Sequence, residues 1–174
     1  YAKRSIARKA SSLRRYFDWL RRRGRIATDP ARSLTAPSGD GRLPRVLRDD
    51  ELASLLDEPP AVVESDPDEI RLRDDAVLEL LYGSGLRVSE LCSLTPGDLD
   101  LRERRVTVWG KGGKQRRVPL SPPAADALDG WIRRGRPALA TDDSPPDRVF
   151  LNRLGRPLTP RDVRRLIDRR SAAP

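Results

Sequence analysis

The sequence of 174 residues has no histidine and only one cysteine, Cys92. A single cysteine excludes a disulfide framework and a cysteine-rich metal site, and it suits a reducing compartment. Long hydrophobic runs are also missing, because the longest covers only a few residues around positions 76–82, which is too short for a membrane span. No charged and then apolar segment typical of a signal peptide opens the chain. We therefore expect a cytoplasmic protein with no membrane partner, and we expect Cys92 in the core.

Aromatic side chains make up only 5% of the sequence. They fall on apolar helix stripes or beside expected strands, whereas RNA recognition typically uses a platform of stacking rings. The acidic residues fall mostly in the first turns of expected helices and in a loop at 58–68, where solvation explains them. These patterns do not favour an RNA-binding protein, a metal-dependent nuclease or a transposase.

Positive charge is abundant, with a formal net charge of +9 and an isoelectric point near 10.6. Clustered cations gain affinity for nucleic acid by releasing its condensed counterions, although a solvated surface would explain the charge equally well. The basic residues comprise 31 arginines and only four lysines. Two of those four, Lys111 and Lys114, lie in one glycine-rich turn.

The first part of the chain predicts one amphipathic helix over residues 3–23, ended by Gly24. Its apolar stripe consists of Ile6, Ala10, Leu13, Phe17 and Leu20. The opposite face is basic and is either solvated or in contact with a DNA backbone. A segment rich in proline, glycine and serine follows at 36–44, so we expect a domain boundary there. We assign 1–36 to the end of a helical unit, 37–46 to a linker and 47–174 to a second domain.

The second domain is expected to be mainly helical with a small antiparallel sheet, an α+β fold. Periodicity and capping signals predict helices at 48–56, 70–82, 87–94, 124–134 and 159–170. Residues 104–109 and 115–120 predict two strands joined by a hairpin turn at 110–114. A further short strand is possible at 148–151.

Arg87 lies between a glycine turn and the start of an expected helix. Its guanidinium and the free backbone N–H groups of the first helical turn could therefore meet on one anion, and a phosphate fits that geometry. The alternative is an ordinary surface arginine at the start of a helix.

Lys111 and Lys114 suggest a different chemistry. Arginine is abundant here and binds phosphate well, so a phosphate clamp alone gives no reason to use lysine. Lysine can donate a proton and arginine effectively cannot. A lysine at a tight hairpin tip is suited to protonating a leaving oxygen, and the glycines would let the backbone approach DNA closely. The alternative is an exposed turn with two solvated lysines.

Two stretches resemble the tyrosine recombinase family, also called phage-integrase-like. They are LYGSGLRVSELCSLTPGDLDL at 81–101 and VWGKGGKQRRVPLS at 108–121. The flanking stretches at 13–34, 36–44 and 149–167 are most similar to the bacterial members that act, with a second recombinase, on chromosome-dimer resolution sites. The partner recombinase itself and a phage integrase remain alternatives.

The resemblance implies part of a catalytic domain, preceded by the end of a helical core-binding domain. It implies that Arg87 is the first of two catalytic arginines, which bind the scissile phosphate and neutralise the transition state. Lys111 would be the general acid for the departing 5′ oxygen, and Lys114 would touch backbone phosphate. Glu90 would be structural, orienting Arg87. The partners implied are a double-stranded DNA recombination site and a second recombinase in a tetramer, with no metal or nucleotide cofactor.

The family's nucleophilic tyrosine and its His-x-x-Arg pair are not matched in these residues, which contain no histidine. We interpret Tyr1, Tyr16 and Tyr82 as structural. The chain starts with Tyr1 rather than methionine, and we interpret it as a fragment that binds DNA weakly and cuts nothing. The alternative is a non-catalytic DNA-binding relative that occupies sites or competes for them.

Overall fold

The structure is a computed structural model, and it describes residues 2–37, 46–56, 64–110 and 113–171. The chain divides into two compact units, Tyr1–Val46 and Leu47–Pro174. The linker expected at 37–46 lies mostly outside the described residues. None of the described helices is both long and apolar enough to cross a membrane.

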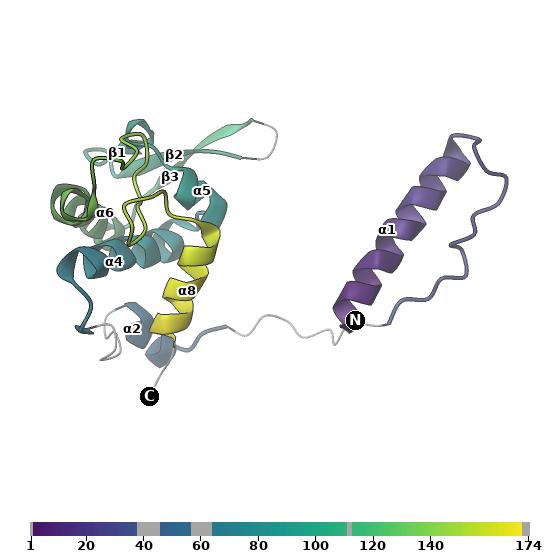
Figure 1. Cartoon of the computed structure of the whole chain (residues 1–174), viewed down its shortest axis with the longest axis horizontal. Coiled ribbons are helices and arrows are strands. Elements are labelled where there is room, and N and C mark those ends of the chain that lie inside the picture. Colours follow the sequence, from purple (N-terminus) through teal and green to yellow (C-terminus); the bar gives the residue numbers. More distant parts are fainter. Residues whose placement is uncertain (1, 38–45, 57–63, 111–112, 172–174) are drawn as a thin grey trace. The chain divides into compact units, whose positions relative to one another are not determined.

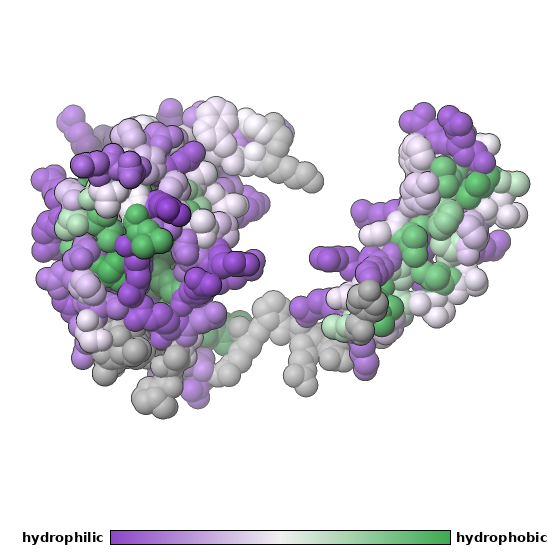
Figure 2. Space-filling view, in the orientation of Figure 1, coloured by the Kyte–Doolittle hydropathy of each residue, from purple (hydrophilic) through white to green (hydrophobic). Residues whose placement is uncertain are grey.

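The first unit is built on one helix, α1 (Lys3–Arg22). Basic residues in its last turn interact favourably with the negative end of the helix dipole. Gly24, with a φ of 66°, follows the helix end. The predicted apolar stripe forms, and Figure 2 shows apolar residues gathered along this helix. Within this unit the stripe is partly uncovered, since Ile6 is 42% exposed and Leu13 is 46% exposed. Ala10 is the one buried residue of α1.

The second unit is mainly helical (Figure 1). Its helical segments are α2 (Asp49–Leu56), α4 (Asp68–Ser84), α5 (Val88–Ser93), the 3-10 turn η1 (Pro96–Asp98), α6 (Pro122–Gly130), the π-helical segment η2 (Trp131–Gly135), α7 (Arg136–Leu139) and α8 (Pro160–Arg170). Together with the three short strands described next, they confirm the expected fold class, mainly α with a small antiparallel sheet.

The sheet has three antiparallel strands in the order β1 (Leu99–Asp100), β2 (Arg105–Trp109) and β3 (Gln115–Pro119). The expected β2–β3 hairpin forms, and its register places Trp109 opposite Gln115. At the open side of the turn, the Gly110 N–H donates to the Lys114 carbonyl at 2.7 Å. In Figure 1 the hairpin extends beyond the helical body of this unit. The strand β1 was not predicted, because two residues carry no readable alternation.

Helix α4 forms the centre of the hydrophobic core. Its apolar side is buried, with Val77 and Leu80 fully covered, and it packs against α6 and η2. The core also includes Leu91 of α5 and Val163 of α8. Burying side chains of this size contributes roughly 1.5 to 3 kcal/mol each. The core therefore fixes the position of the α4–α5 turn, where the candidate site lies.

Residues 149–151 join several parts of this core. The Val149 N–H donates to the Leu94 carbonyl at 3.0 Å, and the indole N–H of Trp131 donates to the Val149 carbonyl at 3.0 Å. The strand considered for 148–151 is a single bridge between Leu151 and Pro157. The segment is therefore a short irregular hairpin rather than a member of the sheet.

The helix expected at 124–134 differs from the observed one at both ends. Helix α6 begins at Pro122, with the Ser121 side chain accepting from the Ala124 N–H as its N-cap. At the other end η2 and α7 continue the helical path to Leu139. Pro137 lies in the first turn of α7, where a residue without an N–H is tolerated. The helical path therefore continues past the π-helical segment.

Candidate phosphate-binding site at the α4–α5 turn

The turn between α4 and α5 presents Arg87 to solvent. Helix α4 ends at Gly85, which has the left-handed conformation with φ 61° and ψ 30°. Leu86 is buried and anchors the turn to the core. Arg87 is the N-cap of α5 in an extended conformation, and its side chain is 69% exposed. Local sequence therefore places this cation at the surface on a rigid support.

Glu90 holds Arg87 in place from the first turn of α5. Its carboxylate accepts the Arg87 backbone N–H at 2.8 Å and Nη1 of the Arg87 side chain at 2.8 Å. This confirms the contact expected between Glu90 and Arg87. It also means that one backbone N–H expected to face an anion is already occupied by Glu90.

Arg116 of β3 contacts the same carboxylate from the other side. Its Nη1 and Nη2 donate to Oε1 and Oε2 of Glu90 at 2.7 and 2.8 Å. Two arginines thus share one carboxylate, and the Glu90 side chain is only 7% exposed. Charge-assisted bidentate pairs of this kind are among the strongest hydrogen bonds in proteins.

The electrostatics of this cluster follow from its geometry. Hydrogen bonds from Arg116 are the largest cause that lowers the pKa of Glu90 to about 2, with the backbone and side chain of Arg87 adding to them and burial opposing them. The same contact raises the pKa of Arg116. Glu90 is therefore ionised at neutral pH, and the three side chains together carry one net positive charge, with Arg87 the most exposed member.

The two lysines of the hairpin stand differently in the structure. Lys111 lies outside the described residues. Lys114 is exposed and lies directly before β3, two residues before Arg116. The structure thus brings Arg87 to β3 through Glu90, while the roles of Lys111 and Lys114 remain predictions.

Arg116 was not identified as a site residue from the sequence. The signal was present in the alternation of β3, where Arg116 and Val118 share the less exposed face and Gln115, Arg117 and Pro119 are exposed. An arginine on the less exposed face of a strand favours a carboxylate partner. The sequence does not show which carboxylate supplies it.

Tyr82 lies near the same turn. It is the third-last residue of α4 and is 61% exposed, so it adds little to the buried core. Trp109, the last residue of β2, is also 61% exposed. Both rings are therefore exposed rather than buried in the core.

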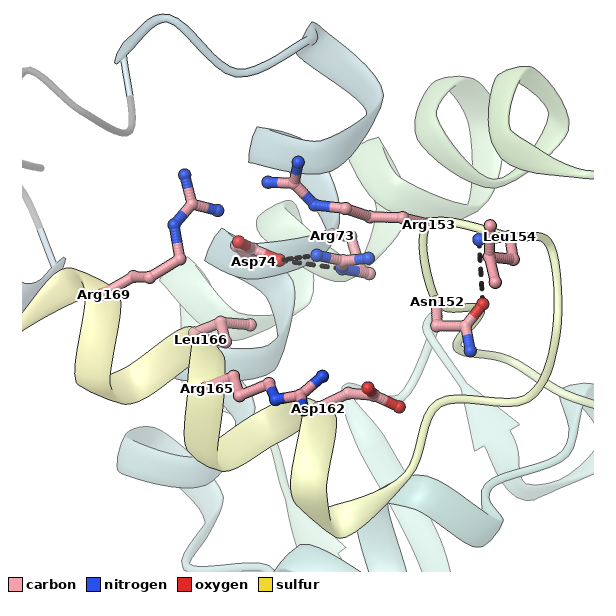
Figure 3. A pocket seen from close by; sticks show the side chains of 9 residues that line it. All are labelled: Arg73, Asp74, Asn152, Arg153, Leu154, Asp162, Arg165, Leu166 and Arg169. Atoms are coloured by element: carbon pink, nitrogen blue, oxygen red, sulfur yellow. Dashed lines mark hydrogen bonds and ion pairs between the residues drawn. The ribbon is translucent and has the colours of Figure 1, made fainter.

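A separate pocket of about 420 Å³ lies between α4, α8 and the loop at 152–154. Figure 3 shows Arg73 and Asp74 of α4 paired at its base, with Arg153 from the loop and Arg165 and Arg169 from α8 around them. Asp66 pairs with both Arg153 and Arg169 at 2.8 Å. None of the residues that line this pocket belongs to the cluster of Arg87, Glu90 and Arg116.

Curated relatives and a family profile match this chain. The profile described as Phage integrase family matches residues 45–173. Tyrosine recombinase XerC of Mycobacterium leprae (strain TN) is 42% identical over 166 residues, which cover 95% of this chain and 55% of the relative. Tyrosine recombinase XerC of Mycobacterium tuberculosis (strain ATCC 25177 / H37Ra) is 42% identical over 173 residues, which cover 99% and 57%. The chain thus spans a little over half the length of these relatives.

Solved structures share the fold. The Tn1549 transposon integrase in complex with transposon right end DNA matches with a TM-score of 0.71 and 21% identity, over 97% of this chain and 58% of that chain. A lambda integrase dimer bound to a COC′ core site matches with a TM-score of 0.65 and 22% identity, over 97% and 57%. Together with the profile match and the XerC relatives, these findings show that the chain belongs to the Phage integrase family, the tyrosine recombinases, and is XerC-like within it.

Proposed function

We propose that this chain supplies the phosphate-binding half of the active site of a site-specific tyrosine recombinase. The reaction would proceed through a covalent 3′-phosphotyrosine intermediate. A tyrosine oxygen attacks the scissile phosphorus, the bond from phosphorus to the 5′ oxygen breaks, and the released oxygen takes up a proton. No nucleotide cofactor is needed, because the protein linkage preserves the bond energy. No metal is proposed either, because arginine cations would neutralise the charge on the phosphate.

The observation that supports this proposal is the exposed guanidinium of Arg87, held by the buried carboxylate of Glu90. A fixed cation can stabilise the charge that develops on the phosphate without paying for reorganisation during the reaction. Arg87 would therefore be the first catalytic arginine, and Glu90 would orient it.

Lys111 would donate the proton to the departing 5′ oxygen, and Lys114 would touch a backbone phosphate. This part of the proposal comes from the sequence, where these are two of only four lysines among 35 basic residues. The described part of the hairpin is compatible with it. Strands β2 and β3 flank the turn, and Arg116 of β3 donates to Glu90, which also contacts Arg87.

These 174 residues contain no histidine and hence no His-x-x-Arg pair. We propose that by themselves they bind duplex DNA weakly without cutting it. The domains we propose are the end of a core-binding unit at 1–36, a linker at 37–46 and part of a catalytic domain at 47–174. A second candidate function is a non-catalytic DNA-binding relative that competes for recombination sites. The reading frame after Pro174 discriminates the two: a stop codon favours the competitor, and a continuation into His-x-x-Arg and then a tyrosine favours the enzyme.

The partners we propose are a double-stranded DNA recombination site and a XerD-like recombinase in a tetramer. The similarity to XerC relatives supports this assignment. The biological role would then be chromosome-dimer resolution in the cytoplasm, which links the protein to chromosome partition and cell division.

The test is single-turnover cleavage of a suicide substrate by a longer protein that joins this chain to the C-terminal part of a XerC relative. Arg87→Ala and Lys111→Ala should each abolish or strongly slow cleavage, while DNA affinity stays within about fivefold of the wild type. Unchanged cleavage by the Lys111→Ala variant would contradict the general-acid role. Cleavage by the 174-residue chain itself would contradict its proposed inactivity.

A further inference from the structure

Arg116 lies outside the set of residues assigned to the reaction, yet it makes the closest side-chain contact in the phosphate site. Its two hydrogen bonds to Glu90 join β3 to α5, 26 residues away in the chain. The Arg116 side chain is 37% exposed, about half the exposure of the Arg87 side chain at 69%. Arg116 is therefore the less exposed of the two arginines bound to Glu90, and Arg87 is the one that solvent reaches more freely.

We infer that Arg116 is a positioning residue of the phosphate site, which neutralises Glu90 so that Glu90 can fix Arg87 without cancelling the positive charge of Arg87. The inference rests on the proposed function, because it concerns the same phosphate contact. It assigns the role to a residue that does not itself touch DNA.

The charge balance is the first reason. Glu90 contacts both the backbone N–H and the side chain of Arg87, so on its own it would form a neutral pair with Arg87. A neutral pair attracts phosphate weakly. With Arg116 bound bidentately on the same carboxylate, the cluster keeps one net positive charge, and its exposed member is Arg87.

The second reason is mechanical. Arg116 is paired in the sheet with Val108 of β2, and the hairpin turn is closed by the hydrogen bond from Gly110 to Lys114. A bidentate guanidinium fixes orientation as well as distance. The contact with Glu90 thus fixes the position, relative to Arg87, of the two strands of the hairpin that contains Lys111 and Lys114.

Arg117 provides a matched control. It is the next residue on β3, is exposed and faces the other side of the strand, and its removal costs the same unit of charge. If only the total positive charge matters, Arg116→Ala and Arg117→Ala should weaken DNA binding equally. If Arg116 acts by positioning Arg87 through Glu90, Arg116→Ala should weaken binding more.

The first experiment is a double-mutant cycle on the chain as it stands, with affinity for a fluorescent DNA duplex measured by anisotropy at low salt. We expect Arg87→Ala to weaken binding about fivefold in the wild-type and Arg117→Ala backgrounds, as for the loss of one phosphate contact. Arg116→Ala should by itself weaken binding more than Arg117→Ala, because it leaves the Glu90 carboxylate to neutralise Arg87, and adding Glu90→Gln to Arg116→Ala should restore most of the lost affinity. Equal losses of affinity in Arg116→Ala and Arg117→Ala, or no recovery on adding Glu90→Gln, would overturn the inference.

The second experiment follows the Glu90 side-chain carboxyl by ¹³C NMR. Arg116→Ala should raise the pH at which this carboxyl titrates by at least about one unit, Arg116→Lys by less, and Arg117→Ala should leave it unchanged. Thermal unfolding of each variant reports whether it is folded. A Glu90 titration that does not move in folded Arg116→Ala refutes the positioning role and leaves the phosphate clamp standing. An affinity unaffected by Arg87→Ala in the wild-type background refutes the clamp, whatever the NMR titration shows.

Discussion

Arg73 and Asp74 are neighbours in the chain and form an ion pair whose side chains are only 6% and 4% exposed. Nε of Arg73 donates to Oδ1 of Asp74 at 2.8 Å, and its Nη1 reaches the Leu151 carbonyl at 3.5 Å. Burial raises the pKa of Asp74, and Arg73 opposes that rise. The pair forms the base of the pocket in Figure 3 and ties α4 to the segment at 149–151.

We expect Asp74→Asn to lower the free energy of unfolding by about 3 to 5 kcal/mol, because it leaves the Arg73 charge buried without its counterion. Urea unfolding followed by circular dichroism measures this. The control is Asp68→Asn, which removes the partner of Arg71 from a pair whose side chains are 82% and 42% exposed and should cost less than about 1 kcal/mol. A loss for Asp74→Asn as small as that of the control would contradict the prediction.

Glu90 predicts how stability depends on pH. Its pKa is lowered from 4.5 to about 2 in the folded chain, so the stability it contributes is present above pH 4.5 and is lost as the pH falls toward 2. The contribution is about 3 kcal/mol. The wild type should therefore lose stability faster than Glu90→Gln between pH 5 and 2.5, in unfolding curves recorded at each pH. Parallel losses in the two proteins would contradict the assignment.

Cys92 should be slow to react. Burial is the larger cause that raises the pKa of its thiol to about 11, and the Asp162 carboxylate adds to it. Because the thiolate is the nucleophile, alkylation by iodoacetamide at pH 8 should be on the order of 100-fold slower than for an exposed thiol. Mass spectrometry of timed samples measures the rate, and the chain unfolded in urea is the reference. Similar rates in the folded and unfolded chain would show that Cys92 is accessible.

Gly85 tests the turn that presents Arg87. Its φ of 61° disfavours a side chain, although an added Cβ would meet nothing within 4 Å. We expect Gly85→Ala to cost about 1 kcal/mol of stability, and Gly85→Asn to cost less, because asparagine tolerates the left-handed conformation better than alanine. Thermal unfolding distinguishes the two. An equal cost for both variants would contradict a conformational origin of the cost.

The elements set by local pattern could be predicted from the sequence. The apolar period of α4 and the glycine turn in the β2–β3 hairpin are short-range signals, and both gave elements close to those observed. The exposure of Arg87 could also be predicted, because Arg87 lies between the turn that ends α4 and the first residue of α5. Its contact with Glu90 spans only three residues.

The parts that depend on distant segments could not be predicted. Arg116 finds its carboxylate 26 residues away, and no local pattern identifies which acid that is. Gly135 is a second case, because glycine usually indicates the end of a helix. Here a Cβ at position 135 would lie 2.5 Å from the ring of Trp131, so the glycine makes room for the buried indole while the helical path continues.

Val149 has a consequence for the order in which this unit forms during synthesis. Its two backbone hydrogen bonds reach Leu94 and Trp131, and α8 covers the core only after another 11 residues. The apolar side of α4 is synthesised before its main partners, α6 and η2, and it stays uncovered on the nascent chain until they have left the ribosome. A nascent chain whose apolar surface is exposed in this interval is prone to non-native association, which chaperones counteract.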